Sequence, residues 1–194
     1  MAYAPTILQC IGQTPLVKLN HVINDQAATV LVKCEFMNPS GSVKDRMAFT
    51  LPDKMSKEKI DMLKAFGAEV VVTPTDVPGD SPLHYVQKAK QIAKETPNAF
   101  YVNQYHNQDN IAAHYHSTGP EIWRQTEGKF DVFVAGTGTG GTISGVGRFI
   151  KEKTSKIKIV GADPIGSVHY DYFYTKKLVE PQVYKVEGIG EDIL

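Results

Sequence analysis

A lysine at position 44 occupies a place where an amine could do chemistry, because it stands directly behind the turn residues Ser40, Gly41 and Ser42. The residues after it have helical character, and a positive charge at a helix N-terminus is unfavourable. Such a place disfavours the ammonium form and favours the free amine that Schiff-base formation requires. A solvated surface position is the commoner fate of a lysine, so Lys44 alone does not define a site.

The second stretch whose residues could form a site is GTGTGGT, which places four glycines and three threonines in residues 136–142. It follows a β-branched apolar run and precedes a segment with helical periodicity. Glycines allow the backbone to approach a phosphate closely, and the exposed N–H groups and positive end of a following helix bind the anion. A tight turn needs fewer glycines and threonines than this, so we predict a phosphate site.

The same loop also fits a dinucleotide. Gly136, Gly138 and Gly141 satisfy the spacing G-x-G-x-x-G, and Asp163 ends the next predicted strand at about the distance expected of a ribose-binding acid. The loop does not say which phosphate binds, so an NAD-dependent dehydrogenase stays open at this point.

Alternating strands and helices must position both stretches. Apolar β-branched runs bounded by turn residues predict strands at 28–36, 68–74, 98–105, 130–136 and 157–163. Helical spacing predicts helices at 42–49, 52–66, 81–95, 110–126 and 142–153, with Ser81 as an N-cap and an interruption at Gly119-Pro120. The alternation predicts an α/β fold of parallel twisted sheets with helices on both faces and ligands at the carboxyl ends of the strands.

Composition narrows the class of partner. The 194 residues carry 21 basic and 21 acidic side chains without a basic stripe, so we expect no nucleic-acid binding. No apolar run approaches the roughly 18 residues of a membrane span, and the N-terminus lacks a signal-peptide pattern. Cys10 and Cys34 form no CxxC motif and are expected to be buried free thiols. We expect a cytoplasmic protein that acts on small molecules.

A metal site is not expected from the histidines. His114 and His116 are two positions apart, so they do not share a helix face, and no cysteine or acidic cluster joins them. We expect them to be surface or core residues.

Together, PSGSVKDR and GTGGT resemble the cystathionine β-synthase and cysteine synthase family, whose members are pyridoxal-phosphate enzymes of the tryptophan synthase β-like fold. The resemblance runs nearly end to end, through IGQTPLVKLN, NQYHNQDNIAAHY, STGPEIW, GADPIGS and VEGIG. It implies a single catalytic region over residues 1–194 and a homodimer, and it makes the dinucleotide interpretation a distant second.

The resemblance also implies roles at matching positions. Lys44 would hold pyridoxal 5′-phosphate as a Schiff base and then remove the substrate's Cα proton. Gln104 would touch the substrate carboxylate. The cofactor phosphate would be cradled by Gly138, Thr139, Gly140, Gly141 and Thr142, and the mouth of the active site would be bordered by Gly188, Ile189 and Gly190.

The implied reaction is β-replacement on serine or an activated serine by a thiol, in sulfur amino acid metabolism. The cofactor ring delocalises the electrons left by proton removal, the β-substituent leaves, and the thiol adds. NQYHNQDNIAAHY, GADPIGS and VEGIGED favour cystathionine β-synthase over cysteine synthase, which combines O-acetylserine with sulfide. A non-catalytic relative that binds phosphate ligands or a full-length partner is the alternative of another class.

The sequence departs from the family pattern after residue 50. Relatives continue with a strand, a Ser-Gly-Asn-Thr-Gly loop that binds the substrate carboxylate, and another helix, whereas Thr50 leads straight into Leu51-Pro52. The chain also stops at Leu194, before the family's later strands. Losing one wall of the cleft misplaces the substrate, and an error of about 1 Å can cost around 10²-fold in rate. We therefore expect an N-terminal lobe that is partly deleted, an incomplete fold and impaired activity.

Overall fold

The computed structural model describes residues 10, 12–19, 29–38, 57–65, 69–74, 77–97, 99, 101–182, 184–186 and 188–191. The chain divides into two compact units: Met1–Glu35 together with Gln104–Leu194, and Phe36–Asn103. The predicted helix at 42–49, which carries Lys44, lies outside the described residues.

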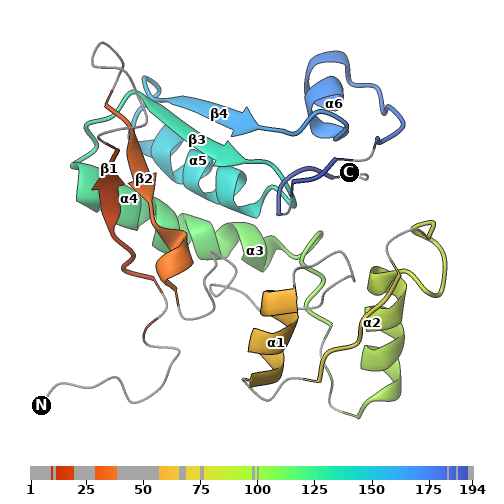
Figure 1. Cartoon of the computed structure of the whole chain (residues 1–194). Helices are drawn as coiled ribbons and strands as arrows, with labels where there is room; N and C mark the ends of the chain where they lie inside the picture. The colour runs from red at the N-terminus through yellow and green to blue at the C-terminus, as the bar shows by residue number, and fades with distance from the viewer. Residues whose placement is uncertain are drawn as a thin grey trace, which may run out of the picture. The chain divides into compact units, whose positions relative to one another are not determined.

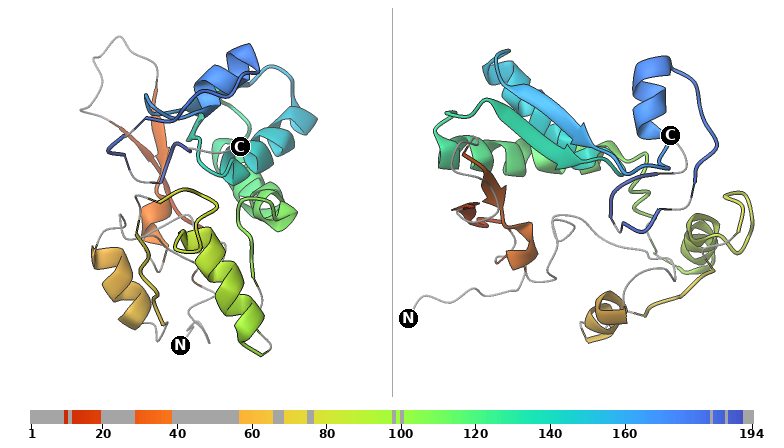
Figure 2. Two further views of the ribbon diagram at one scale, coloured as in Figure 1. Left: turned by 90° about the vertical axis from the view of Figure 1, so that its right-hand side faces the viewer. Right: turned by 45° about the horizontal axis from the view of Figure 1, so that its top comes forward.

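The larger unit is built on a parallel βαβ motif. β3 (Val132–Gly136) pairs in parallel with β4 (Lys158–Ala162), and α5 (Gly141–Lys153) connects them. Figure 1 shows α5 running along one side of the pair, and the right-hand view of Figure 2 shows the two strands side by side. The predicted strand–helix–strand order at 130–163 is confirmed.

The core of this unit lies between α5 and the strands. Val146 and Ile150 are fully buried, and because they are four residues apart they share one face of α5. Phe133 and Ile159 pack against them from β3 and β4. Burying each such side chain stabilises the fold by about 1.5–3 kcal/mol, so α5 is held against the two strands.

A nearly continuous helical run packs against α5. It consists of α3 (Gln108–Ala113), a π-helical turn η4 (His114–Thr118) and α4 (Gly119–Thr126). The predicted break at Gly119-Pro120 is wrong, because the wider turn before it accommodates the proline. The Gly119 N–H donates to the His114 carbonyl, an i to i−5 bond, and Pro120 stands in the first turn of α4, where its missing N–H costs nothing.

The N-terminal strands form a hairpin. β1 (Leu16–Lys18) pairs antiparallel with β2 (Leu31–Lys33), and a 3-10 turn η2 (Glu35–Met37) follows. The strand predicted at 28–36 is confirmed over Leu31–Lys33, but its predicted length and its place in a parallel sheet are wrong within the described residues. Among the residues that the structure describes, β2 pairs with β1 alone, and β1 is a three-residue strand that the sequence pattern did not predict.

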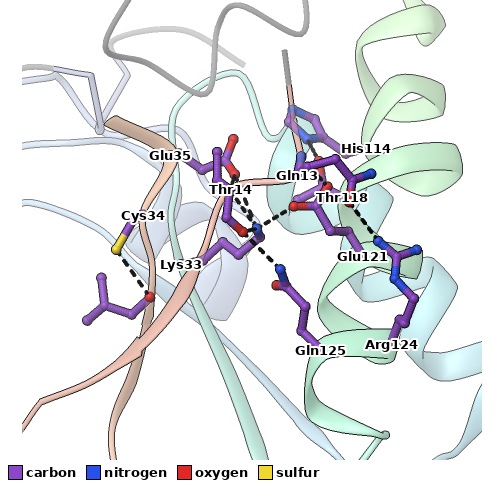
Figure 3. Close-up of polar contacts among 11 residues, drawn as sticks. Gln13, Thr14, Lys33, Cys34, Glu35, His114, Thr118, Glu121, Arg124 and Gln125 are labelled. Carbon is purple, nitrogen blue, oxygen red and sulfur yellow. Dashed lines mark hydrogen bonds and ion pairs between the residues drawn. The ribbon is translucent and has the colours of Figure 1, made fainter. Parts of the chain in front are cut away.

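A buried ion pair ties the hairpin to α4. Lys33 Nζ lies 2.5 Å from Glu121 Oε1, and the two side chains are only 12% and 4% exposed. Lys33 also donates to the hydroxyl and the carbonyl of Thr14, whose hydroxyl donates to Glu35 at 2.5 Å. Figure 3 shows these side chains gathered around the Lys33 ammonium, with Gln125 adding a 2.9 Å bond to the Thr14 carbonyl.

The smaller unit contains α1 (Lys57–Ala65) and α2 (Tyr85–Glu95). The helices predicted at 52–66 and 81–95 are confirmed over these bounds. The strands predicted at 68–74 and 98–105 are wrong: residues 69–74, 99 and 101–105 form no strand, and Val71 and Val72 are exposed. A strand needs a hydrogen-bonded neighbour, and the described residues of this unit supply none.

The start of α2 also differs from the prediction. Tyr85 is its first residue, and the His84 ring accepts from the Val86 N–H at 3.4 Å as the N-cap. Ser81 instead accepts from the Leu83 N–H at 3.2 Å in a preceding turn, because its side chain closes a local bond before the helix can begin.

The cysteines divide between two environments. Cys34 is buried as expected, whereas Cys10 is exposed, so the prediction of two buried thiols is half wrong. Burial of Cys34 follows from its place after β2 in the hairpin. Among the described residues, the structure contains no helix with the length and apolarity that crossing a membrane requires.

Candidate anion-binding site at the glycine loop

The glycine loop connects the carboxyl end of β3 to α5. Gly140, the N-cap, has φ +78°, a left-handed conformation that favours glycine. The Ser144 N–H donates to the Gly140 carbonyl at 2.9 Å and so closes the first turn of α5. The N–H groups of the residues between them point out of the helix end without intrahelical acceptors, and the helix dipole adds positive potential there.

Two kinds of glycine occupy this loop. A Cβ on Gly141 would overlap the side-chain amide of Asn110, and a Cβ on Gly136 would overlap Ile189. At Gly138 and Gly140, by contrast, a Cβ would meet no atom closer than 3.4 Å. Close packing therefore requires glycine at Gly136 and Gly141, whereas at Gly138 and Gly140 an added Cβ would make only ordinary van der Waals contacts. N–H donors and threonine hydroxyls in one loop together fit a phosphate group.

Asn110 connects the loop to a second predicted site residue. Its side chain is 5% exposed, and its Nδ2 donates to the Thr139 hydroxyl and to the Gln104 carbonyl, both at 3.0 Å. The Asn110 side chain thus connects the backbone of Gln104 to the predicted phosphate cradle.

His114 connects the loop to the π-helical turn. The imidazole is 2% exposed, with Nε2 3.2 Å from the Thr142 hydroxyl and Nδ1 2.9 Å from the Thr118 hydroxyl. This contact depends on Gly145, where a Cβ would overlap the Ile111 carbonyl and the His114 Cβ. The absence of a side chain at Gly145 lets α5 approach the α3–η4 run closely.

The segment from Gly188 to Gly190 lies against the same loop. The Gly190 N–H donates to the Thr137 carbonyl at 2.5 Å, and Ile189 packs on Gly136. A further contact comes from α6 (His169–Thr175), where His169 Nε2 lies 2.8 Å from the Gly138 carbonyl. Residues 188–190 and His169 therefore form one border of the candidate site.

Asp163 does not present a free carboxylate to a ribose. One oxygen accepts from the Thr137 hydroxyl at 2.6 Å, and the other accepts from the Tyr170 N–H at 3.0 Å. Because both oxygens are engaged locally, the dinucleotide interpretation loses the acid on which it depended.

The structure therefore gathers most of the predicted site. The cradle of 138–142, the Gln104 backbone and the Gly188–Gly190 segment are brought together, whereas Lys44 lies outside the described residues. Sequence reasoning missed Asn110 and His114 as neighbours of the cradle. Their spacing of four residues places both on one helix face, and that signal could have found them.

A family model described as "Pyridoxal-phosphate dependent enzyme" matches residues 48–193, which begin just after Lys44. Curated relatives include a cystathionine beta-synthase from Apis mellifera, 39% identical over 235 residues, which cover 98% of this chain and 46% of the relative. A cysteine synthase 1 from Neurospora crassa is 37% identical and covers 93% of this chain and 60% of the relative. The chain thus spans about half the length of the curated relatives it matches.

Solved structures show the same likeness. An O-acetylserine dependent cystathionine beta-synthase from Helicobacter pylori aligns with a TM-score of 0.84 and 29% identity, covering 100% of this chain and 75% of the other. A hydrogen sulfide-producing enzyme from Fusobacterium nucleatum aligns with a TM-score of 0.79 and 29% identity, covering 98% and 73%. The Apis alignment is longer than the 194 residues of this chain, so that relative has internal residues that the chain lacks.

Proposed function

The chain belongs to the family of pyridoxal-phosphate dependent enzymes, and on that premise we propose that its glycine loop binds the phosphate of pyridoxal 5′-phosphate. Membership confirms the resemblance inferred from the sequence motifs, and the solved structures confirm the α/β fold class. The observation that carries the proposal is the glycine loop itself, in which Thr139 and Thr142 lie at the N-terminus of α5 and Gly140 takes the left-handed N-cap conformation.

Each residue of the cradle has a definite task. The N–H groups at the start of α5 donate to phosphate oxygens, and the Thr139 and Thr142 hydroxyls add two more donors. When bound, the cofactor supplies an electron sink for the electrons left by removal of a Cα proton. Gln104 contacts the substrate carboxylate, and Gly188, Ile189 and Gly190 border the mouth of the site.

Lys44 provides the amine in this proposal. Its amine would hold the cofactor covalently when the site is occupied, and the freed amine would accept the Cα proton as a base. A positioned base of this kind contributes typically 10²–10⁴-fold to the rate. Support comes from the motif PSGSVKDR and from its order and spacing relative to the glycine loop.

The reaction we propose is β-replacement on serine or an activated serine by a thiol, of the cystathionine β-synthase type. Support comes from six relatives named cystathionine beta-synthase, which are 37–39% identical to the chain. Cysteine synthase chemistry is the alternative, since relatives with that name match almost as well.

We also propose that this chain carries out the reaction slowly. The alignments are longer than the chain, which supports the absence of an internal segment that relatives contain. Without the carboxylate-binding loop, the substrate's Cα–H bond is poorly oriented, and a misplacement of about 1 Å lowers the rate by around 10²-fold. A single catalytic region with a shortened N-terminal lobe, a homodimeric state and a cytoplasmic location complete the proposal.

Reductive trapping tests the proposed function. The chain is mixed with pyridoxal 5′-phosphate, reduced with borohydride and digested, and the labelled peptide is identified by mass spectrometry. We expect the label at Lys44, its loss in Lys44→Ala, and its retention in Lys57→Ala, a matched control whose side chain is 85% exposed in the same unit. Equal labelling of scattered surface lysines in the parent and in Lys44→Ala would sink the proposal.

A turnover assay separates the enzyme from a non-catalytic relative. If serine and a thiol are added to the loaded chain, slow formation of a thioether product supports impaired β-replacement. Labelled Lys44 without any product supports the non-catalytic alternative, and a rate equal to that of an intact relative contradicts the impairment.

A further inference from the structure

We propose that Asn110 and His114 are positioning residues that orient the hydroxyl groups of Thr139 and Thr142 toward the bound phosphate. The inference rests on the proposed function, because it assigns a role to the side chains directly behind the phosphate cradle. Neither residue touches the phosphate itself. Each donates a hydrogen bond to a threonine oxygen. The hydrogen of that hydroxyl then remains to be donated to the phosphate.

The second partner of Asn110, the Gln104 carbonyl, determines the direction of its hydrogen bond to Thr139. A backbone carbonyl is only an acceptor, so the Asn110 atom that faces the Gln104 carbonyl at 3.0 Å is the amide nitrogen. The same nitrogen lies 3.0 Å from the Thr139 hydroxyl and donates its second hydrogen there. Thr139 therefore receives one hydrogen bond from the protein and has its own hydrogen free for a phosphate oxygen.

His114 has the same relation to Thr142. The phosphate accepts hydrogen bonds only, so Thr142 serves the anion when its hydroxyl hydrogen points away from the imidazole. This requires the hydrogen of the neutral imidazole to be on Nε2, 3.2 Å from Thr142. In this arrangement Nδ1 accepts from the Thr118 hydroxyl, which lies 2.9 Å away and can act as the donor.

Burial makes the arrangement rigid. Asn110 is 5% and His114 2% exposed, so water does not compete for their hydrogen bonds. Both side chains are held by close approach to α5, because a Cβ at Gly141 would overlap the Asn110 amide and a Cβ at Gly145 would overlap His114. Donors that are oriented before the ligand arrives bind it without the cost of reorganisation.

The test compares two probes that differ only in the phosphate. Dissociation constants of pyridoxal 5′-phosphate and of pyridoxal are measured by equilibrium dialysis for the full chain and its variants. His114→Asn places its amide short of the Nε2 position, whereas the longer side chain of His114→Gln reaches it. We expect His114→Asn to weaken pyridoxal 5′-phosphate binding roughly tenfold without changing pyridoxal binding, and His114→Gln to restore most of the loss.

A double-mutant cycle with Thr142→Val isolates the coupling. If His114 acts through Thr142, the loss caused by His114→Asn largely disappears in the Thr142→Val background. Independent losses that multiply, or equal losses for the two probes, overturn the inference. Should His114→Asn fail to fold, the parallel cycle of Asn110→Ala with Thr139→Val applies the same criterion.

Binding of the two probes to the unmodified parent chain distinguishes a failure of this inference from a failure of the proposed function. If the parent binds pyridoxal 5′-phosphate no more tightly than pyridoxal, the phosphate cradle is wrong and the positioning role falls with it. If the parent prefers the phosphorylated probe and the variants keep that preference, only the positioning role is overturned.

Discussion

The larger and smaller units differ in how completely their elements find partners. In the larger unit, β3 pairs with β4, α5 covers one face of the pair, and Val146 and Ile150 are fully buried. In the smaller unit, α1 and α2 form, but residues 69–74 remain without strand structure and expose Val71 and Val72. Helices close their hydrogen bonds locally, whereas a strand depends on a neighbour elsewhere in the chain.

This difference bears directly on function. The proposed phosphate cradle belongs to the larger unit, whose hydrogen bonds and apolar core are made within that unit. Lys44 belongs to the smaller one, in which the family pattern is interrupted after residue 50. Variants of the larger unit can therefore test the proposed phosphate cradle separately from Lys44.

The buried ion pair gives the largest expected effect. Glu121→Ala leaves the Lys33 ammonium buried without its closest carboxylate, so we expect the free energy of unfolding to fall by about 3–5 kcal/mol. Urea unfolding followed by the fluorescence of Trp123, the chain's only tryptophan, reports on the larger unit. Glu127→Ala removes an exposed pair with Lys129 and is expected to change stability by less than about 1 kcal/mol. Equal effects would show that the hairpin is not held by the buried pair.

Two glycines of α5 provide the next test. Gly145→Ala forces its Cβ against the Ile111 carbonyl, and we expect a loss of about 1–3 kcal/mol together with weaker phosphate binding. At Gly147 a Cβ would meet Ile159 at an ordinary 3.5 Å, so Gly147→Ala is expected to stabilise the helix by roughly 0.5–1 kcal/mol. Stabilisation by both substitutions would show that Gly145 does not limit the approach of α5 to the α3–η4 run.

Apolar truncation compares the two units directly. Ile150→Val removes one methyl group from a fully buried side chain, and we expect a loss of about 0.5–1.5 kcal/mol. Val72→Ala removes methyl groups from a side chain that is 52% exposed, and we expect a change within about 0.5 kcal/mol. The midpoints of thermal unfolding give the comparison. A larger effect at Val72 would indicate that residues 69–74 are buried in solution.

The smallest expected effect is a pH dependence at the surface. The Tyr115 hydroxyl donates to Glu152 Oε2 at 2.5 Å, and this bond holds the pKa of Glu152 below its ordinary value of 4.5. A lowered folded pKa stabilises the protein above the ordinary value, and that contribution is lost as pH falls through the folded value. We expect Glu152→Gln to lower the thermal midpoint slightly at neutral pH and not in strong acid. A difference that persists in strong acid would assign the effect to another cause.

The sequence predicted those features that depend on neighbours along the chain. The strand–loop–helix at 130–153 follows from a β-branched run, a glycine cluster and helical spacing, and all three are local. The start of α2 was predicted too early because Ser81 and His84 compete as caps. The π-helical turn and the contacts of Asn110 and His114 with the threonines require α5 to be in place, and Gly145 reveals its role only when the two helices meet.

The most direct measurement of the central claim is the ³¹P NMR signal of pyridoxal 5′-phosphate mixed with the chain. We predict a bound signal that is shifted and broadened relative to the free cofactor. Gly138→Asp places a carboxylate within the proposed phosphate cradle and should abolish that signal, whereas Gly79→Asp, at a position with no atom within 4 Å of the added Cβ, should retain it. A parent signal identical to that of the free cofactor, or one that Gly138→Asp leaves unchanged, would contradict the account.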